Sequence, residues 1–396
     1  MNVSRVVSAV VVLLLATGCT AAADSAAQGG SDATASPGSG DATPGAGAGD
    51  RRAVQRILDR RARALRTGGR RLFLSDVYRG DERFVELQER YFHNLRQLPW
   101  ETLEYDVLAD RWNPSFAEER WESSAYIPFV RVRMQLRGFD EVPVVFTTGI
   151  TFVQREGRWV VVSDTDVADQ VRDGAQETPW DLTRIVVKRS ENVLAVFDTD
   201  SAKRSGQVMD ALDDSVQVVS DALPSGWDGR VVVYATADKQ VLSAFDYVPG
   251  SDVDGLGAVA FPVFAREHSR RVASMRFLVH PRSLELKGPW LRAVLGHELT
   301  HVALARRSSG VPIWLAEGVA EYVGMQGMPR AQWRIAASVV KRARRGATEL
   351  PGVATFNAID QAWHYSLSWF ACDYIAATYG DEKVWELLRT MHNGGR

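Results

Sequence analysis

The stretch His297-Glu298-Leu299-Thr300-His301 constrains this chain more than any other. Apolar residues recur around it at helical spacing, and Pro289 stands where a helix can begin, so a helix is predicted. Two histidines four residues apart lie on one face of a helix, where both imidazoles can bind the same zinc ion. Glu298 follows the first histidine and can take a proton from a water on that metal. The alternative is a packed helix with this spacing by chance, although only 7 histidines occur in 396 residues.

Charge and cysteine content argue against two classes of protein. Lys plus Arg number 47 and Asp plus Glu 49, a formal charge of −2 that argues against a nucleic-acid-binding protein. Short basic runs such as Arg51-Arg52 are expected to be solvated helix faces. The two cysteines, Cys19 and Cys372, exclude a disulfide framework. Cys372 lies in an apolar helical pattern and is expected to be buried.

The first 19 residues have the form of a secretory signal. Arg5 precedes an apolar run from Val6 to Ala16, and Thr17-Gly18-Cys19 follows. The run is too short for a stable membrane span. This ending resembles the lipobox of bacterial lipoproteins, although Ala16 stands where that family most often has Leu. The resemblance implies that Cys19 becomes the lipidated mature N-terminus, and the alternative is an ordinary signal peptide cut nearby.

Both alternatives place the protein outside the cytoplasmic membrane, and the lipobox adds a membrane anchor. Residues 20–50 are almost entirely Ala, Gly, Ser, Thr, Asp and Pro, without apolar periodicity. We expect them to form a flexible tether between the anchor and the folded part.

Residues 51–170 are predicted to form one domain. Alternation from Val130 to Arg137 is typical of a half-exposed antiparallel strand, and Glu156-Gly157 of a hairpin turn. Helices followed by a curved antiparallel sheet resemble the NTF2-like cone fold, for which a non-catalytic binding or spacer role is the default. The predicted helices are 51–66, Leu72–Val77 and Phe84–Leu95, and the predicted strands are Thr102–Ala109, Ala125–Arg137, Val142–Gln154 and Arg158–Asp164.

A polar stretch from Asp164 to Pro179, interrupted by Gly and Pro, is the expected domain boundary. Residues 180–396 then read as a small mixed sheet followed by helices, so the fold class of the whole chain is α+β. The expected elements before the histidine helix are the strands Arg184–Lys188, Val193–Phe197, Arg230–Tyr234, Ala258–Phe264 and Ser274–Val279, and a helix over 201–222.

A second motif follows the histidine helix, Trp314-Leu-Ala-Glu317-Gly318-Val-Ala-Glu321-Tyr322. Pro312 can open a helix here, on which Glu317 and Glu321 share a face because they are four residues apart. Catalytic zinc takes three protein ligands and keeps an open position, and two histidines with one glutamate are one such set. Ligating imidazoles also donate their other N–H to an acceptor, which Glu321 could provide. The alternative for both glutamates is an exposed helix acid.

Together the two motifs resemble the gluzincin zinc peptidases, in particular the small peptidase MA-like group. The resemblance implies that Glu317 is the third zinc ligand and that Glu321 orients a ligating histidine. In that family a tyrosine hydroxyl stabilises the oxyanion, and the stretch Tyr365-Ser366-Leu367-Ser368 is similar to the segment that carries it. This resemblance implies that Tyr365 has that role. His364 beside it is a second candidate, and the alternative is that Tyr365 only packs against its neighbours. Only fifteen residues separate His301 from Glu317, and the Gly-x-Met-x-Asn signature of aminopeptidases is absent, so exopeptidase specificity is not implied.

The sequence therefore predicts an envelope-anchored zinc peptidase with one Zn²⁺ per chain. Its ligands would be His297, His301 and Glu317, and Glu298 would be the general base. The expected substrate is a peptide or protein of the cell envelope. One alternative is a non-catalytic binding or scaffold lipoprotein that retains the metal site, and another is that the N-terminal domain acts as a small-ligand or cell-wall sensor.

Overall fold

The computed structural model describes residues 48–394 except 114, 169–176, 225, 239–240, 242–256, 267–268, 309, 334, 347–348 and 357–359. The predicted signal sequence, Cys19 and nearly all of the predicted tether lie outside these residues. The described chain forms two compact units. The N-terminal unit runs to Arg184 and also includes Val263–Ser274, and the C-terminal unit comprises the remaining residues from Ile185 onward.

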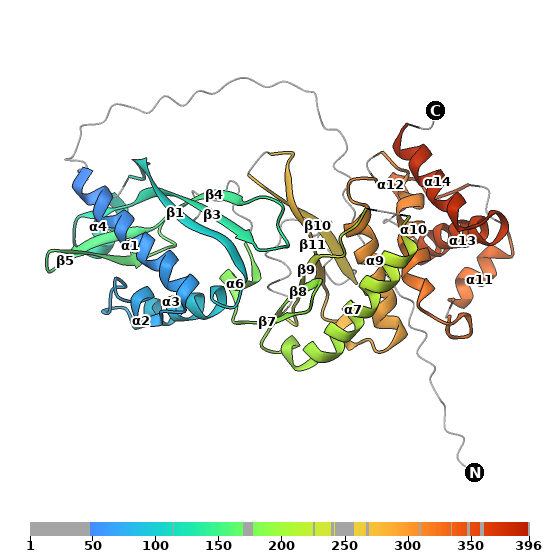
Figure 1. The fold of residues 1–396 in the computed structure, drawn as a ribbon, viewed down its shortest axis with the longest axis horizontal. Helices are drawn as coiled ribbons and strands as arrows, with labels where there is room; N and C mark the ends of the chain where they lie inside the picture. Colours follow the sequence, from blue (N-terminus) through green and yellow to red (C-terminus); the bar gives the residue numbers. More distant parts are fainter. Residues whose placement is uncertain are drawn as a thin grey trace, which may run out of the picture. The chain divides into compact units, whose positions relative to one another are not determined.

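The N-terminal unit contains helices and two three-stranded antiparallel sheets, with strand orders β1-β3-β4 and β2-β5-β6. The first residues of β3 alternate between buried and exposed, as the sequence predicts for a half-exposed strand. The elements, labelled in Figure 1 where there is room, are α1 (Ala48–Thr67), α2 (Arg70–Phe73), α3 (Glu82–Leu95), β1 (Trp100–Arg111), α4 (Ser115–Trp121), β2 (Ala125–Tyr126), β3 (Pro128–Leu136), β4 (Val144–Gly149), β5 (Thr151–Arg155), β6 (Arg158–Ser163) and α6 (Pro179–Leu182).

Four predictions for this unit need correction, and one is confirmed. Helix α1 begins at Ala48, inside the segment assigned to the tether. The predicted helix Leu72–Val77 is wrong beyond Phe73, because the chain turns and Val77 forms a bridge with Val161. The predicted strands 125–137 and 142–154 are each two strands, and in both cases the two belong to different sheets (β2 and β3, β5 and β4). The hairpin turn at Glu156-Gly157 is confirmed, since both residues have the positive φ that a tight β-hairpin turn requires.

The C-terminal unit has a five-stranded mixed sheet with strand order β10-β11-β9-β8-β7. Strand β9 pairs in parallel with β8 and β11, whereas β7 pairs with β8 in antiparallel fashion. The α+β class and the small mixed sheet are thus as predicted. The elements are β7 (Ile185–Arg189), β8 (Val193–Asp198), η1 (Ser201–Arg204), α7 (Ser205–Ala222), β9 (Val231–Ala235), β10 (Ala258–Phe264), β11 (Val272–Val279), η3 (Ser283–Glu285), α9 (Pro289–Leu304), α10 (Ile313–Gln326), η4 (Arg330–Gln332), α11 (Ala337–Ala343), α12 (Val353–Phe356), α13 (Gln361–Tyr379) and α14 (Asp381–His392).

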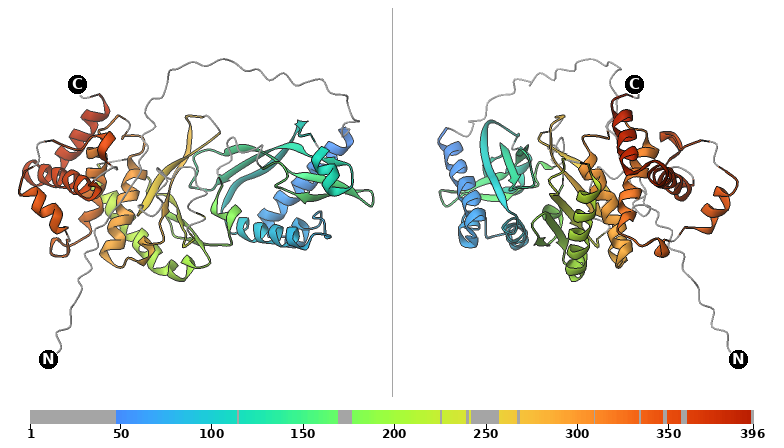
Figure 2. Two further views of the ribbon diagram at one scale, coloured as in Figure 1. Left: turned by 180° about the vertical axis from the view of Figure 1, so that it is seen from behind. Right: turned by 45° about the vertical axis from the view of Figure 1, so that its right-hand side comes forward.

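The main core of this unit lies between one face of the sheet and its helices. Every second residue of β8 (Val193, Ala195 and Phe197) is fully buried and belongs to the same apolar cluster as residues of α7, α9 and α10. Helix α9 packs against α7 and α10, and α10 also packs against α13 (Figure 1, Figure 2). Helix α10 therefore lies between α9 and α13.

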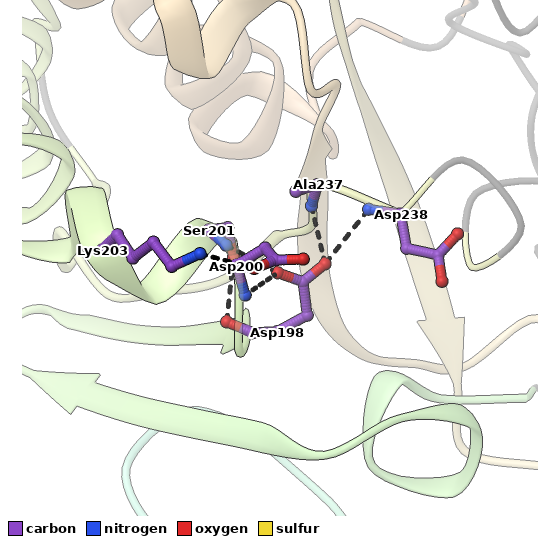
Figure 3. Close-up of polar contacts among 6 residues, drawn as sticks. All are labelled: Asp198, Asp200, Ser201, Lys203, Ala237 and Asp238. Carbon is purple, nitrogen blue, oxygen red and sulfur yellow. Dashed lines mark hydrogen bonds and ion pairs between the residues drawn. The ribbon is translucent and has the colours of Figure 1, made fainter.

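Asp198 joins the ends of two parallel strands in this core (Figure 3). Its carboxylate accepts hydrogen bonds from Ser201 N, Thr236 Oγ1 and Ala237 N, each 2.7 Å long, and from Asp200 N and Asp238 N at 3.1 Å. Burial raises the pKa of Asp198, but these hydrogen bonds outweigh burial and lower it overall. The carboxylate thus stabilises the connections that follow β8 and β9.

Within the described ranges, no helix is both long and apolar enough to span a bilayer.

Candidate metal centre

Helix α9 is the central element of the site, and it runs from Pro289 to Leu304 as the sequence predicts. Nearly all of its residues after Arg292 are buried, so it is packed on all sides instead of having one solvated face. Pro289 stands in its first turn, where its missing N–H is not needed. The two histidines are therefore held on a rigid buried helix, with His297 fully buried and His301 7% exposed.

Helix α10 brings the third group to these histidines. It begins at Ile313, directly after Pro312, and its residue Glu317 is fully buried. The Nε2 atoms of His297 and His301 lie 3.0 Å apart, and each lies 3.3 Å from Glu317 Oε2. Two residues of one helix and one of the next thus present three ligand atoms to a common point.

These separations fit a metal ion with tetrahedral coordination. Ligands about 2.0–2.1 Å from zinc in a tetrahedron are about 3.3–3.4 Å from each other. Two of the three observed separations are 3.3 Å, and the third is slightly shorter. His297, His301 and Glu317 form the one group of three or more metal-binding side chains found among the described residues. The buried set can hold a metal ion.

Electrostatics in the site favour a bound cation. Burial lowers the pKa of His297, but hydrogen bonds to Glu317 and Glu321 outweigh burial and raise it above its usual value. Burial raises the pKa of Glu317, and the charges and hydrogen bonds of the two histidines reverse this and lower it. Without a metal, this interior carboxylate thus needs a protonated imidazole beside it. A divalent cation supplies the same compensation and leaves both imidazoles neutral, as ligation requires.

Glu298 lies next to the ligands and is fully buried. Burial raises its pKa to about 7, although the two histidines partly offset this. The backbone amide of Ala260 in strand β10 also interacts with the carboxylate. Neither oxygen makes a hydrogen bond of ordinary geometry with any described residue. A buried carboxylate that titrates near neutral pH beside a metal site is suited to accepting and returning a proton.

Of the remaining predicted residues, Glu321 and Tyr365 lie beside His297. Glu321 Oε1 is 3.3 Å from His297 Nδ1, the nitrogen that faces away from the proposed metal position. The Tyr365 ring is buried, 6.3 Å from the His297 ring, and packs edge-on against Phe356. The ring of His364 instead lies with Nδ1 3.0 Å from the carbonyl oxygen of Phe356.

Two features of the site could not be read from the sequence. One is Ala260, whose approach to Glu298 depends on where the edge of the sheet lies. The other is a set of glycines at which helix α10 contacts α9 and α13. Gly324 is one of them, and nothing in the sequence marks it apart from its position seven residues after Glu317. The predicted lipidation site, Cys19, lies outside the described residues.

Comparison with known proteins assigns the chain to no group. No protein-family model matches the sequence, and a search of curated proteins finds no similar one.

Proposed function

We propose that this protein is an envelope-anchored zinc peptidase of the gluzincin type. The observation that carries the proposal is the convergence of His297, His301 and Glu317, with Glu298 beside them. Structural zinc sites usually have four protein ligands, whereas catalytic sites have three and an open position. A three-ligand set next to a buried carboxylate that titrates near pH 7 therefore favours catalysis over a structural role.

Zinc at this site would lower the pKa of a coordinated water and polarise the carbonyl group of the substrate. Glu298 accepts the proton released when water attacks the peptide carbonyl carbon, and it delivers that proton to the leaving amine nitrogen. Glu321 Oε1, 3.3 Å from His297 Nδ1, would accept a hydrogen bond from that nitrogen and so keep the other ring nitrogen aimed at the ligand position. Tyr365 donates its hydroxyl hydrogen to the oxygen on which negative charge develops.

The position of strand β10 at the edge of the sheet supports a peptide as the substrate. Strand β10 is the edge strand of the described sheet, and its residue Ala260 lies against Glu298. An edge strand can pair with an extended peptide through backbone hydrogen bonds. A peptide bound along β10 would pass beside the carboxylate that moves the proton.

The proposal also covers the lipid anchor with its linker, and the N-terminal unit. Lipidation at Cys19 would anchor the protein to the membrane, and the residues up to 47 would link the anchor to the folded part. The three N-terminal helices followed by antiparallel sheets support an NTF2-like fold for the N-terminal unit, with a binding or spacer role.

The test is hydrolysis of a peptide library by the wild type and the Glu298→Gln variant. This substitution keeps the size of the side chain and removes its ability to take a proton. We expect the variant to retain one zinc per chain and to lose hydrolysis by about 10²–10⁴-fold. Glu119→Gln, in an exposed helix of the N-terminal unit, is the matched control and should cleave normally. If the wild type binds zinc and cleaves nothing in the library, a non-catalytic binding role replaces the peptidase; equal cleavage by Glu298→Gln would refute the mechanism.

A further inference from the structure

Near the metal ligands, helix α10 makes very close contacts with α9 and with α13 at glycines. A Cβ atom added to Gly324 would lie 2.7 Å from the carbonyl oxygen of Ala293 and 3.0 Å from the backbone nitrogen of His297. A Cβ atom added to Gly296 would lie 3.2 Å from Gly324 Cα. The obstacles are backbone atoms, which cannot rotate away as a side chain can. Helices α9 and α10 therefore meet backbone to backbone, one residue before the first ligand.

The second close contact joins α10 to α13. A Cβ atom added to Gly318 would lie 2.5 Å from the carbonyl oxygen of Ser368 and 2.9 Å from Cys372 Sγ. Ser368 is three residues after Tyr365 on α13, and Gly318 directly follows Glu317 on α10. The backbone contact at Gly318 thus fixes the helix that carries the tyrosine against the helix that carries the carboxylate ligand.

The two contacts occupy different faces of α10. At about 100° per residue, Glu317, Glu321 and Gly324 fall within an arc of roughly 60°, and Gly318 lies about 100° from Glu317. Gly324 therefore belongs to the face that presents both carboxylates to α9. Gly318 belongs to a neighbouring face, which meets α13 instead.

We propose that Gly324 and Gly318 are positioning residues with separate tasks: Gly324 sets the distance between the histidines and Glu317, and Gly318 sets the distance of Tyr365 from the ligands. The metal-binding half of this inference stands without catalysis, and the part that concerns turnover rests on the proposed function. Ordinary Cβ contacts begin at 3.4 Å, so alanine at 324 requires α9 and α10 to separate by about 0.7 Å, the difference from 2.7 Å. Metal–ligand distances tolerate only about 0.2 Å of change.

Alanine at 318 requires a shift of about 0.9 Å, the difference between 3.4 and 2.5 Å. Helix α13 takes up this shift, because its residue Tyr374 is 62% exposed whereas α10 also packs against both α9 and α7. Tyr365 moves with α13, and the three ligand atoms on α9 and α10 keep their spacing.

The experiment compares Gly324→Ala, Gly318→Ala and Gly206→Ala in the chain expressed without residues 1–19. Gly206 lies in helix α7, and a Cβ atom added there would meet no other atom within 4 Å, so Gly206→Ala is the matched control. Co²⁺ replaces zinc as the probe, and its visible absorption bands report coordination geometry. Affinity comes from competition with a chelator, and folding from thermal unfolding of the metal-free protein.

We expect Gly324→Ala to bind Co²⁺ at least about 10-fold more weakly than the control, with altered absorption bands. Gly318→Ala should keep the control's affinity and spectrum, and its crystal structure should show Tyr365 displaced relative to His297. Control-like Co²⁺ binding by folded Gly324→Ala would overturn the proposal, as would equal loss of metal in both variants or an unmoved Tyr365. If Gly324→Ala does not fold, the milder Gly296→Ala takes its place, and it too must weaken Co²⁺ binding.

Activity separates this inference from the proposed function. If the wild type hydrolyses peptides, Gly318→Ala should lower kcat more than it raises KM, because Tyr365 acts on the developing charge. If no variant hydrolyses a peptide while the Co²⁺ results follow the expected pattern, the positioning roles stand and the peptidase proposal falls.

Discussion

Replacing Glu317 by alanine should abolish the stabilisation of this protein by zinc. Glu317 is fully buried and lies 3.3 Å from both histidine nitrogens, so the substitution removes one of the three protein ligands. At free zinc of 100 times Kd, binding stabilises the wild type by about 2.7 kcal/mol. For a unit of roughly 200 residues this raises Tm by about 5–10 °C.

Glu321→Gln gives an intermediate case, because its side chain contacts a ligand without binding the metal. Loss of such a contact weakens metal affinity about 10–100-fold, which leaves about 0.4–1.4 kcal/mol of stabilisation at the same free zinc. The corresponding rise in Tm is about 1–5 °C. Glu317→Ala loses a ligand outright and should show less than about 2 °C.

The assay is scanning calorimetry of the chain without residues 1–19, with and without zinc at one fixed free concentration. The Glu119→Gln control should behave as the wild type, since that side chain lies in the other unit. The expected order of zinc-induced shifts is wild type, then Glu321→Gln, then Glu317→Ala. A Glu317→Ala shift as large as that of the wild type would refute the assignment of this side chain as a ligand.

Three further predictions concern single residues. Tyr365→Phe should retain zinc and lose about 100-fold in kcat on a cleaved peptide, and an unchanged kcat would remove the tyrosine from the mechanism. Asp198→Asn should destabilise the C-terminal unit by roughly 2 kcal/mol at pH 7 in urea unfolding. The pKa of Asp198 is lower in the folded than in the unfolded protein, so its stabilisation is complete above the unfolded pKa of about 3.9 and is lost as pH falls through the folded pKa. The free energies of unfolding of wild type and variant should therefore converge only in acid. Burial raises the pKa of Cys372 to about 12, so its thiol should react slowly with a thiol reagent at pH 8 until urea is added. The chain without residues 1–19 is used for this test, and fast labelling of the native protein would contradict the burial of Cys372.

Spacing along the chain predicted those parts of the site that depend on one helix. His297 and His301 had to share a face because they are four residues apart, and the structure places their Nε2 atoms 3.0 Å from each other. The same rule placed Glu317 and Glu321 together on α10. That these two helices meet was predicted by resemblance to a family and not by the spacing itself.

Tertiary contacts account for what could not be predicted. The apolar residues from Leu72 to Val77 fit a helix, but Val77 at the end of that segment forms a β-bridge with Val161 instead. A glycine within a helix can mark flexibility or a close contact with another backbone. At Gly324 the contacting backbone is that of Ala293, which is 31 positions earlier in the chain, so the sequence does not reveal the contact. Residues Val263–Ser274 belong by their contacts to the N-terminal unit, although both flanking segments belong to the other.

The most direct test of the metal assignment is zinc content combined with X-ray absorption at the zinc edge, for the wild type and Glu317→Ala. We predict one zinc per wild-type chain, with two imidazole nitrogens and a carboxylate oxygen at about 2.0–2.2 Å, and much less zinc in the variant. A wild-type protein without stoichiometric zinc, or a zinc environment that is the same in both proteins, would contradict the assignment of His297, His301 and Glu317 as a zinc site.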